Sequence, residues 1–297
     1  MGMTIGLSAF ALLLMLDVLT GEFRKPRVFS MNEMGVNLIS MTIAFTLRAL
    51  PLAGITYLLG RFLPEWRNSI AHVNFAAIFL ATLVVDDYGN YWFHRNAHRI
   101  PFLWRLHKPH HIPTQMNVLM GVRENTFYYL LIPVNLMAPI LVFIGAGSAA
   151  ATMLGLKLVV GYLQHTGYRW DLWVRRFAPG RVLLNIAEGI FTLQDFHHAH
   201  HGIGRYGNAS SNYGNVLNIW DRLHNTSSGH PRCPQDAYGL PVGVKVESWP
   251  VQLFWPLCQT RRKSPVAPIS LVSSSSAELA TAEAVIHTFD GLAIAVK

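Results

Sequence analysis

Long apolar runs separated by short polar stretches dominate the first half of the chain. The apolar runs cover residues 4–20, 36–60, 70–85 and 127–165. A bilayer core of about 30 Å requires roughly 20 apolar residues per helix, so these runs are close to the length of membrane-spanning helices. The pattern therefore predicts an all-α integral membrane bundle of about four transmembrane helices.

Two of these runs carry features that refine the prediction. Arg48 and Pro51 interrupt the run 36–60, so we expect either a kink or two shorter helical pieces there. The run 4–20 has the length of a signal sequence. It lacks the basic segment before it and the small-residue cleavage site after it, so we expect a retained anchor.

The run 127–165 is too long for one membrane crossing and is broken by Gly145, Gly147 and Ser148. It therefore predicts a helical hairpin. A hairpin returns the chain to the side of the membrane that it left, so the polar segments before and after it are expected on one face. That face also carries most of the Lys and Arg residues, and the positive-inside rule makes it cytoplasmic.

Four regions follow from this pattern. Residues 1–69 are expected to form N-terminal membrane anchor segments, and residues 70–230 a central region that contains the hairpin. The chain beyond the hairpin is more polar, so we expect a cytoplasmic, histidine-rich helical cap that extends through 231–260. The tail 261–297 begins with basic residues and contains a run of serines, a composition that predicts disorder.

The composition agrees with a membrane location and excludes some other classes of protein. Hydrophobic residues make up 51% of the chain and charged residues only 13%, which is unusual for a soluble protein. The formal net charge of +8 comes from Lys and Arg residues between apolar runs, so nucleic acid is not the expected partner. Cys233 and Cys258 are too far apart for a CxxC motif and are expected to be reduced thiols.

Eight histidines form three clusters in the polar segments on either side of the hairpin. Residues four apart share one face of a helix, so the first pair can converge on one ion. The spacing i, i+3, i+4 recurs in the other two clusters, and lets each cluster offer ligands to two adjacent ions. Eight imidazoles exceed the needs of a tetrahedral zinc ion and suit a pair of metal ions with open positions. The eight candidate ligands are His94, His98, His107, His110, His111, His197, His200 and His201.

Other residues near these clusters are candidates for a supporting role. Asp87 lies seven residues before His94, where a carboxylate can bind metal or accept the second ring N–H of a ligating histidine, although it can also simply end a membrane helix. His165, at the returning end of the hairpin, is either a ninth ligand, a supporting donor or a helix cap. His198 points away from its neighbours and is expected outside the ligand set. Pro109 suits the first turn of a helix, so we expect a helix to begin there.

These motifs resemble those of the fatty acid hydroxylase and sterol desaturase superfamily, which are integral membrane di-metal oxygenases. The segment 94–98 resembles the HxxxH box of that superfamily, and the segments 107–111 and 197–201 resemble its two HxxHH boxes. The Asn-Tyr-Gly at 212–214 and the Trp-Asp-Arg-Leu at 220–223 resemble the signature that follows. The order of the motifs also agrees, and the resemblance covers roughly half of the chain.

The resemblance implies a membrane enzyme that holds two iron ions and uses O2 to hydroxylate or desaturate a lipid, such as a fatty acyl chain or a sterol. The chain contains no haem-binding HPGG-like motif, so electrons are expected from a separate carrier or reductase. Asp221, in the second signature, becomes a further candidate ligand or supporting residue. The site is expected to face the cytoplasm, at the endoplasmic reticulum of a eukaryote or the inner membrane of a bacterium.

Other interpretations fit the same residues less well. A zinc-dependent hydrolase would need a general base, but Arg95 stands where the HExxH motif places its Glu. A membrane metal-binding or transport protein would place its ligands near the bilayer midplane. The chain also departs from the superfamily at His224 and Asn225, where an aromatic residue and a glycine are common. This puts the local loop in doubt but not the histidine set.

Overall fold

The computed structural model describes residues 2–25, 30–229 and 231–259. Helices dominate these residues, and their strands form one short antiparallel pair, β1 (Gly202–Ile203) with β2 (Ala237–Tyr238). This confirms the prediction of a mainly helical protein. The predicted disordered tail, 261–297, lies outside the described residues.

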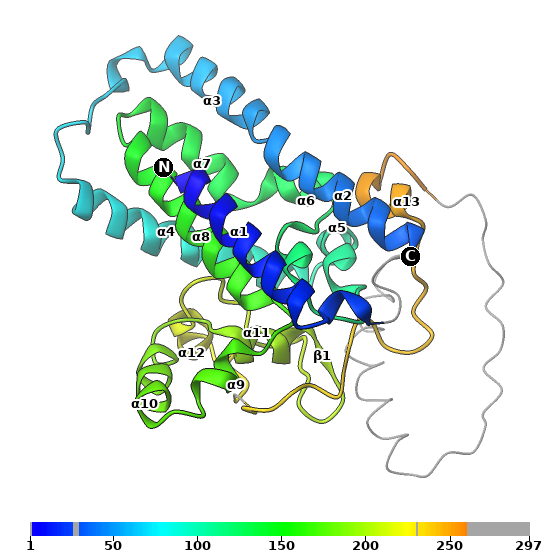
Figure 1. The fold of residues 1–297 in the computed structure, drawn as a ribbon. Coiled ribbons are helices and arrows are strands. Elements are labelled where there is room, and N and C mark those ends of the chain that lie inside the picture. The colour runs from blue at the N-terminus through cyan, green and yellow to red at the C-terminus, as the bar shows by residue number, and fades with distance from the viewer. Residues whose placement is uncertain (1, 26–29, 230, 260–297) are drawn as a thin grey trace.

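The long helices run along one common direction, as Figure 1 shows. The connection between α3 and α4 and the turn between α7 and α8 meet at one end of the bundle, which is called the far end below. There the N–H of Asn68 donates to the carbonyl of Phe143 at 3.0 Å, and the N–H of Ile70 donates to the carbonyl of Ile144 at 3.1 Å. Helix α1 contacts α8, α3 contacts α7, and α4 contacts both α7 and α8. These helices are α1 (Gly2–Leu19), α2 (Met31–Thr46), α3 (Ala49–Phe62), α4 (Phe75–Ala97), α7 (Pro133–Phe143) and α8 (Gly147–His165).

Two helical stretches of the described chain are long and apolar enough to cross a membrane. These are Met31–Phe62 and Thr126–Phe143, and Thr4–Leu19 is a shorter apolar helix. The second half of α4 is interrupted by polar side chains, including Asp86 and Asp87, which lowers its hydropathy. Two candidate spans are therefore found, and the predicted total of about four remains a prediction.

The apolar stretch Met31–Phe62 is built from two helical pieces, as predicted. Helix α2 ends at Thr46 and α3 begins at Ala49. Pro51 is the third residue of α3, where a backbone N–H has no partner within the helix, so the proline costs no hydrogen bond. Arg48 lies at this break.

The hairpin region folds as α6 (Thr126–Leu131) and α7, a tight turn, and α8. Gly145 in the turn has a φ of +96°, in the left-handed region that favours glycine. A Cβ at this position would lie 2.8 Å from the Cβ of Ala71, so the close contact between the two far-end connections also requires glycine.

The remaining elements gather at the opposite end of the bundle, where Figure 1 shows α9 to α12 and β1 together. Asp17 fixes α1 to this end, because its carboxylate accepts the backbone N–H groups of Val118, Gly167 and Tyr168. The elements are η1 (Glu22–Arg24), α5 (Pro101–His111), η3 (Val118–Val122), α9 (Trp170–Val174), α10 (Ala178–Ala187), α11 (Gln194–His201), α12 (Ile219–Leu223) and α13 (Trp249–Phe254), and η2 (Pro64–Trp66) lies at the far end.

Helix α5 begins earlier than the sequence pattern suggested. The prediction of a helix start at Pro109 is wrong, because Pro101 takes the first helical position after the extended Ile100, and Pro109 lies inside the last turn. Only one helical hydrogen bond is lost there, since the helix ends at His111. The three histidines of this segment therefore project from the end of a helix rather than from its start.

Candidate metal centre

Nine buried histidines gather where α4, α5, α8 and α11 meet. They form two groups, and within each group the candidate ligand atoms all lie within 4.8 Å of one another. All eight histidines predicted from the sequence are present, and His165 from the end of α8 joins them. The first group is His94, His98, His107, His111 and His200, and the second is His110, His165, His197 and His201.

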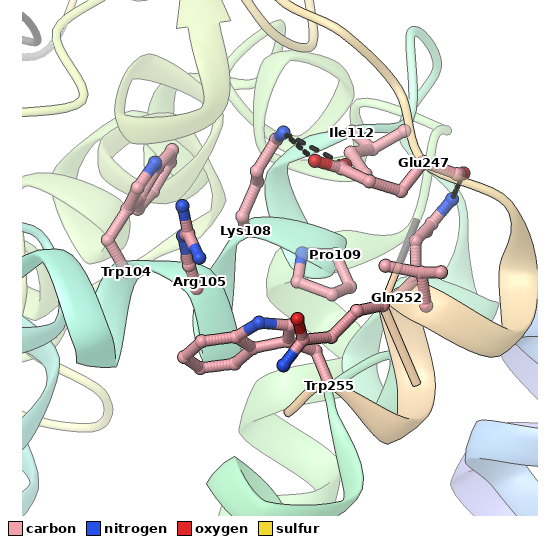
Figure 2. Close-up of a pocket in the computed structure, with 10 residues that line it drawn as sticks. Trp104, Arg105, Lys108, Pro109, Ile112, Glu247, Gln252 and Trp255 are labelled. Atoms are coloured by element: carbon pink, nitrogen blue, oxygen red, sulfur yellow. Dashed lines mark hydrogen bonds and ion pairs between the residues drawn. The ribbon is translucent and has the colours of Figure 1, made fainter. Parts of the chain in front are cut away.

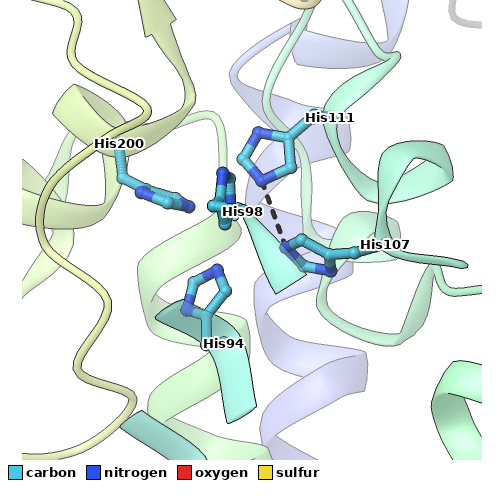
Figure 3. Close-up of side chains that lie close together, drawn as sticks. All are labelled: His94, His98, His107, His111 and His200. Carbon is cyan, nitrogen blue, oxygen red and sulfur yellow. Dashed lines mark hydrogen bonds between the residues drawn. The ribbon is translucent and has the colours of Figure 1, made fainter. Parts of the chain in front are cut away.

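The first group surrounds a common centre, as Figure 3 shows. The Nε2 atoms of His94, His98 and His200 are buried and have no hydrogen-bond partner among the described residues. The Nε2 atoms of His107 and His111 face each other at 3.2 Å. Buried nitrogen atoms are rarely left without a partner, so this arrangement fits a bound cation.

The second group is arranged in the same way. The Nε2 atom of His165 lies 3.1 Å from that of His110 and 2.8 Å from that of His197, and the Nε2 atoms of His197 and His201 are 3.1 Å apart. Nitrogen atoms bound to one metal ion at about 2.1 Å have separations near 3 Å. The residues of both groups therefore fit metal ions.

Hydrogen bonds on the outer side of the rings orient the inner nitrogens. Four histidines donate their Nδ1–H to a backbone carbonyl, which leaves the lone pair of Nε2 directed toward the centre. This is the tautomer that metal binding requires. The pairs are His94 with Tyr213 at 2.9 Å, His110 with Arg123 at 3.1 Å, His165 with Gly161 at 2.6 Å and His200 with Ser211 at 2.7 Å.

His107 is oriented by a carboxylate instead. Its Nδ1 lies 3.0 and 3.2 Å from the two carboxylate oxygens of Glu124. Burial raises the pKa of Glu124 well above its usual range. Glu124 was not among the residues predicted from the sequence, although its position just before a long apolar run was an available signal.

Burial also keeps the histidines neutral. It lowers the pKa of His94 to about 4 and those of His98 and His200 well below their usual value. Protonation of one ring is further opposed by its neighbours, because a second positive charge would lie a few ångströms away. At neutral pH each ring therefore offers a lone pair to a metal ion.

Asp87 supports the site from a distance. Its carboxylate accepts the backbone N–H groups of Val216 and Leu217 at 3.0 and 2.9 Å and the indole N–H of Trp220 at 3.0 Å. None of these bonds involves a histidine. Asp87 therefore positions the segment that follows residues 212–214, and it does not lie in either histidine group.

Asp221 acts on the same segment. Its carboxylate accepts the N–H groups of Tyr213 at 2.8 Å and Gly214 at 2.6 Å, and the hydroxyl of Thr226 at 2.7 Å. The carbonyl of Tyr213 in turn accepts the Nδ1–H of His94. Asp221 is therefore a positioning residue for His94.

His198 is in neither of the two histidine groups. Its Nδ1 forms a hydrogen bond of 2.9 Å with the hydroxyl of Tyr238, which is part of β2. This contact links α11 to the short strand pair.

The two residues that depart from the superfamily pattern, His224 and Asn225, both fit the local structure. His224 takes the place of the usual aromatic residue, with its ring 5.1 Å from that of Tyr91 and 4.9 Å from that of Trp92. Asn225 has a φ of +54°, a conformation that favours glycine and that asparagine tolerates better than most residues. Both replacements are therefore accommodated locally.

Two cavities reach the histidines. One of about 130 Å³ opens from the bundle side on histidines of both groups, and apolar side chains and Arg48 line it. The other, of about 140 Å³, is lined by His111 and His201 and by residues of the glycine-rich segment 202–210. The rings of His111 and His201 stack at 4.3 Å, so this opening lies at the junction of the two groups.

Another cavity, of about 420 Å³, lies between α5 and α13, and its lining contains no histidine. Figure 2 shows its lining, including Trp104, Arg105 and the ion pair between Lys108 and Glu247 at 2.9 Å. The Trp104 ring lies 5.2 Å from that of His98 and 5.6 Å from that of His111. One aromatic side chain therefore separates this cavity from the first histidine group.

Comparison with known proteins agrees with these features. Residues 79–226 match the sequence model of the fatty acid hydroxylase family. Alkylglycerol monooxygenase of Danio rerio is 31% identical over 60% of this chain and 36% of its own length. Ornithine lipid hydroxylase OlsE of Rhizobium tropici is 31% identical over 61% of this chain and 50% of its own length. Methylsterol monooxygenase 1-2 of Arabidopsis thaliana is 25% identical over 50% of this chain and 45% of its own length.

The chain spans between about a third and a half of the length of these relatives. No solved structure matches it.

Proposed function

Since residues 79–226 of this chain belong to the fatty acid hydroxylase family, we propose that the protein is a membrane-bound oxygenase that uses O2 to hydroxylate or desaturate a lipid. The observation that carries the proposal is the pair of adjoining histidine groups with inward-facing nitrogens. The relatives named monooxygenase and hydroxylase support the reaction class.

We further propose that each group holds one iron ion. Bound iron would supply the activation of O2 and the oxidation of a C–H bond. Imidazole ligands are neutral, so they leave the charge of the ions intact and leave coordination positions open. The five residues of the first group and the four of the second would be the ligands, with Glu124, Tyr213 and Asp221 holding ligand rings in place.

The cavity on the bundle side is the proposed binding site for the lipid. Its wall includes Ile132, Val134, Leu154 and Leu158, so an apolar chain can lie against it without contact with water. The histidines at its inner end would then face one C–H bond of that chain. The position of the chain decides between a hydroxyl and a double bond, because both outcomes begin with removal of the same hydrogen.

Electrons would come from a separate carrier protein or reductase. Hydroxylation requires two of them, since RH + O2 + 2 e⁻ + 2 H⁺ gives ROH + H2O. The position of Trp104 supports a donor on the cap side, because its indole lies between the cavity of about 420 Å³ and the rings of His98 and His111.

The proposed arrangement in the cell follows the charge pattern of the chain. The histidine end would face the cytoplasm, at the endoplasmic reticulum of a eukaryote or the inner membrane of a bacterium. Residues 1–69 would anchor the chain and residues 70–230 would form the catalytic domain, with 231–260 completing the cap.

The alternative, a membrane metal-binding protein or zinc-dependent hydrolase, has less support. Arg95, at the position of the hydrolase Glu, stacks on the ring of Trp92 at 5.0 Å and belongs to neither histidine group. Nine imidazoles in two groups also exceed a single zinc site.

The proposal is tested by metal content and by O2-dependent product formation in membranes that contain the full-length protein. We expect about two iron ions per chain and a lipid that gains one oxygen atom from ¹⁸O2 or loses two hydrogens. His107→Ala and His200→Ala should abolish the product. His72→Ala, an exposed histidine near the far-end connection, should not. One zinc ion per chain without O2 consumption would contradict the oxygenase.

A further inference from the structure

Arg48 is a half-buried cation without a counter-ion among the described residues. It lies at the break between α2 and α3, in the middle of the apolar stretch Met31–Phe62. Its Nε and Nη1 atoms are buried and donate to no acceptor among the described residues. Its guanidinium carbon lies 5.3 Å from the centre of the Tyr129 ring. No ion pair with a carboxylate is found for it in the part of the chain that the structure describes.

Two other cations of the bundle are paired with carboxylates. Arg123 forms an ion pair with Glu33 at 2.8 Å, and Lys157 forms one with Asp86. An arginine keeps its charge in any environment, and an unpaired charge in an apolar region is unfavourable. Charged residues within membrane segments therefore usually have a functional partner.

The lining of the cavity indicates where such a partner would lie. Arg48 lines the same cavity of about 130 Å³ as His94 and His107. Arg48 and His107 contact consecutive residues of α6. Arg48 lies over the ring of Tyr129, and the ring of His107 stacks on that of Tyr128 at 4.7 Å. The cavity lining thus combines Arg48, apolar side chains and histidines of both groups with the polar residues Asn90, Glu124, Lys157 and Asn215.

A second donor without a partner lies close by. The hydroxyl of Tyr162 is buried and has no hydrogen-bond partner among the described residues. The Tyr162 ring packs against Gly121, a residue of the cavity wall, so closely that a Cβ there would lie 2.9 Å from it. Two buried donors without acceptors therefore lie in or next to one cavity, which is the arrangement expected around an absent acceptor.

We propose that Arg48 binds an anionic oxygen of the lipid, in a carboxylate or a phosphate group, and so selects both the class of lipid and the C–H bond that faces the histidines. This inference rests on the proposed function, since it names the substrate class of the same cavity. An anionic oxygen would accept hydrogen bonds from the free guanidinium N–H groups and neutralise their charge. The carbon chain would then extend along the apolar wall toward His94 and His107.

Ligand binding tests the inference without metal or turnover. The full-length protein, in nanodiscs of phosphatidylcholine, is titrated with oleate, oleyl phosphate and oleyl alcohol, which share one chain and differ in the polar group. Affinity is measured from the rise in melting temperature with ligand concentration. We expect oleate or oleyl phosphate to bind at least tenfold more tightly than the alcohol, and the tighter of the two identifies the acceptor group.

Three variants assign this preference to Arg48. Arg48→Met should remove the preference for the anionic ligands, and Arg48→Lys should retain part of it. Arg61→Met, an exposed arginine in the last turn of α3, should leave the preference unchanged. Arg48→Met should melt at or above the wild-type temperature without ligand, because it removes buried N–H groups that have no acceptor, so its loss of preference does not reflect unfolding.

The outcomes separate this inference from the proposed function. Equal binding of all three ligands by the wild type, or the same anionic preference in Arg48→Met, would overturn the role of Arg48 whether or not the protein is an oxygenase. An anionic preference that depends on Arg48, in a protein that consumes no O2, would support the binding site and contradict only the oxygenase.

Discussion

The Nδ1–H of His94 donates to the carbonyl of Tyr213 at 2.9 Å, although 119 positions separate the two residues in sequence. His94 belongs to the first histidine cluster and Tyr213 to the signature that follows the last one. The carboxylate of Asp221 accepts the N–H of Tyr213 and so holds this part of the backbone in place. The signature after the last cluster thus orients a candidate ligand of the first.

Replacement of Asp221 by Asn should weaken metal binding. The amide nitrogen cannot accept a hydrogen bond, so the N–H of Tyr213 or Gly214 loses its partner and the carbonyl that holds His94 shifts. Loss of such a supporting contact reduces metal affinity by about 10- to 100-fold. Affinity is measured by competition with a chelator. Asp236→Asn is the matched control, because exposed Asp236 accepts a backbone N–H from Arg205 far from His94. Equal affinity in both variants would contradict this role.

Replacement of His165 should lower the metal content, whereas replacement of His198 should leave it unchanged. His165 is one of four members of the second group, whereas His198 lies outside both groups and contacts Tyr238. We expect His165→Ala to retain about one ion per chain after dialysis and His198→Ala to retain two. The ratio of metal to protein, measured for each variant, shows how many ions are retained. Two ions in His165→Ala would show that three histidines suffice and that His165 is only a neighbour.

The backbone conformation of Asn225 predicts which residues that position accepts. Its φ of +54° costs about 1 to 2 kcal/mol for an ordinary side chain and more for a β-branched one. Asn225→Val should therefore lower the free energy of unfolding by at least about 1 kcal/mol, and Asn225→Gly should be tolerated. Denaturant unfolding of the two variants measures the difference. Equal stability of the Val and Gly variants would show that the loop relaxes without strain.

The histidine spacing was sufficient to identify eight members of the two groups. Residues three or four apart on one helix face the same way whatever the tertiary structure, so His197, His200 and His201 could be placed together from sequence alone. The hairpin explained how clusters far apart in sequence meet, because it returns the chain to the same end of the bundle.

Contacts that depend on tertiary packing were harder to predict from the sequence. His165 stands alone in sequence, and only the end point of α8 brings it to the second group. Glu124 orients His107 from 17 positions away, and the carbonyl of Tyr213 orients His94 from 119 positions away. The position of Glu124 before an apolar run was a signal in the sequence, but nothing in the sequence paired either residue with its histidine. The misplaced helix start at Pro109 has a similar cause, since a proline near the end of a helix costs little when the helix stops soon after it.

The buried histidines should make the metal-free protein sensitive to mild acid. An exposed histidine in the unfolded chain has a pKa of about 6.5, whereas burial lowers the pKa of His94 in the folded protein to about 4. Between these values the unfolded state binds more protons than the folded state, so stability falls as the pH falls. Each such histidine contributes about 1.4 kcal/mol per pH unit in this range and nothing above it.

We therefore expect the melting temperature of the metal-free protein to be nearly constant from pH 7.5 to 6.5 and to fall by several degrees between pH 6.5 and 5. His94→Gln removes one buried histidine that resists protonation, so its melting temperature should fall less steeply. His72→Gln, at an exposed position, should leave the slope of the wild type unchanged. A melting temperature that stays constant down to pH 5 would mean that the histidines take up protons in the folded state, which is incompatible with the burial described above.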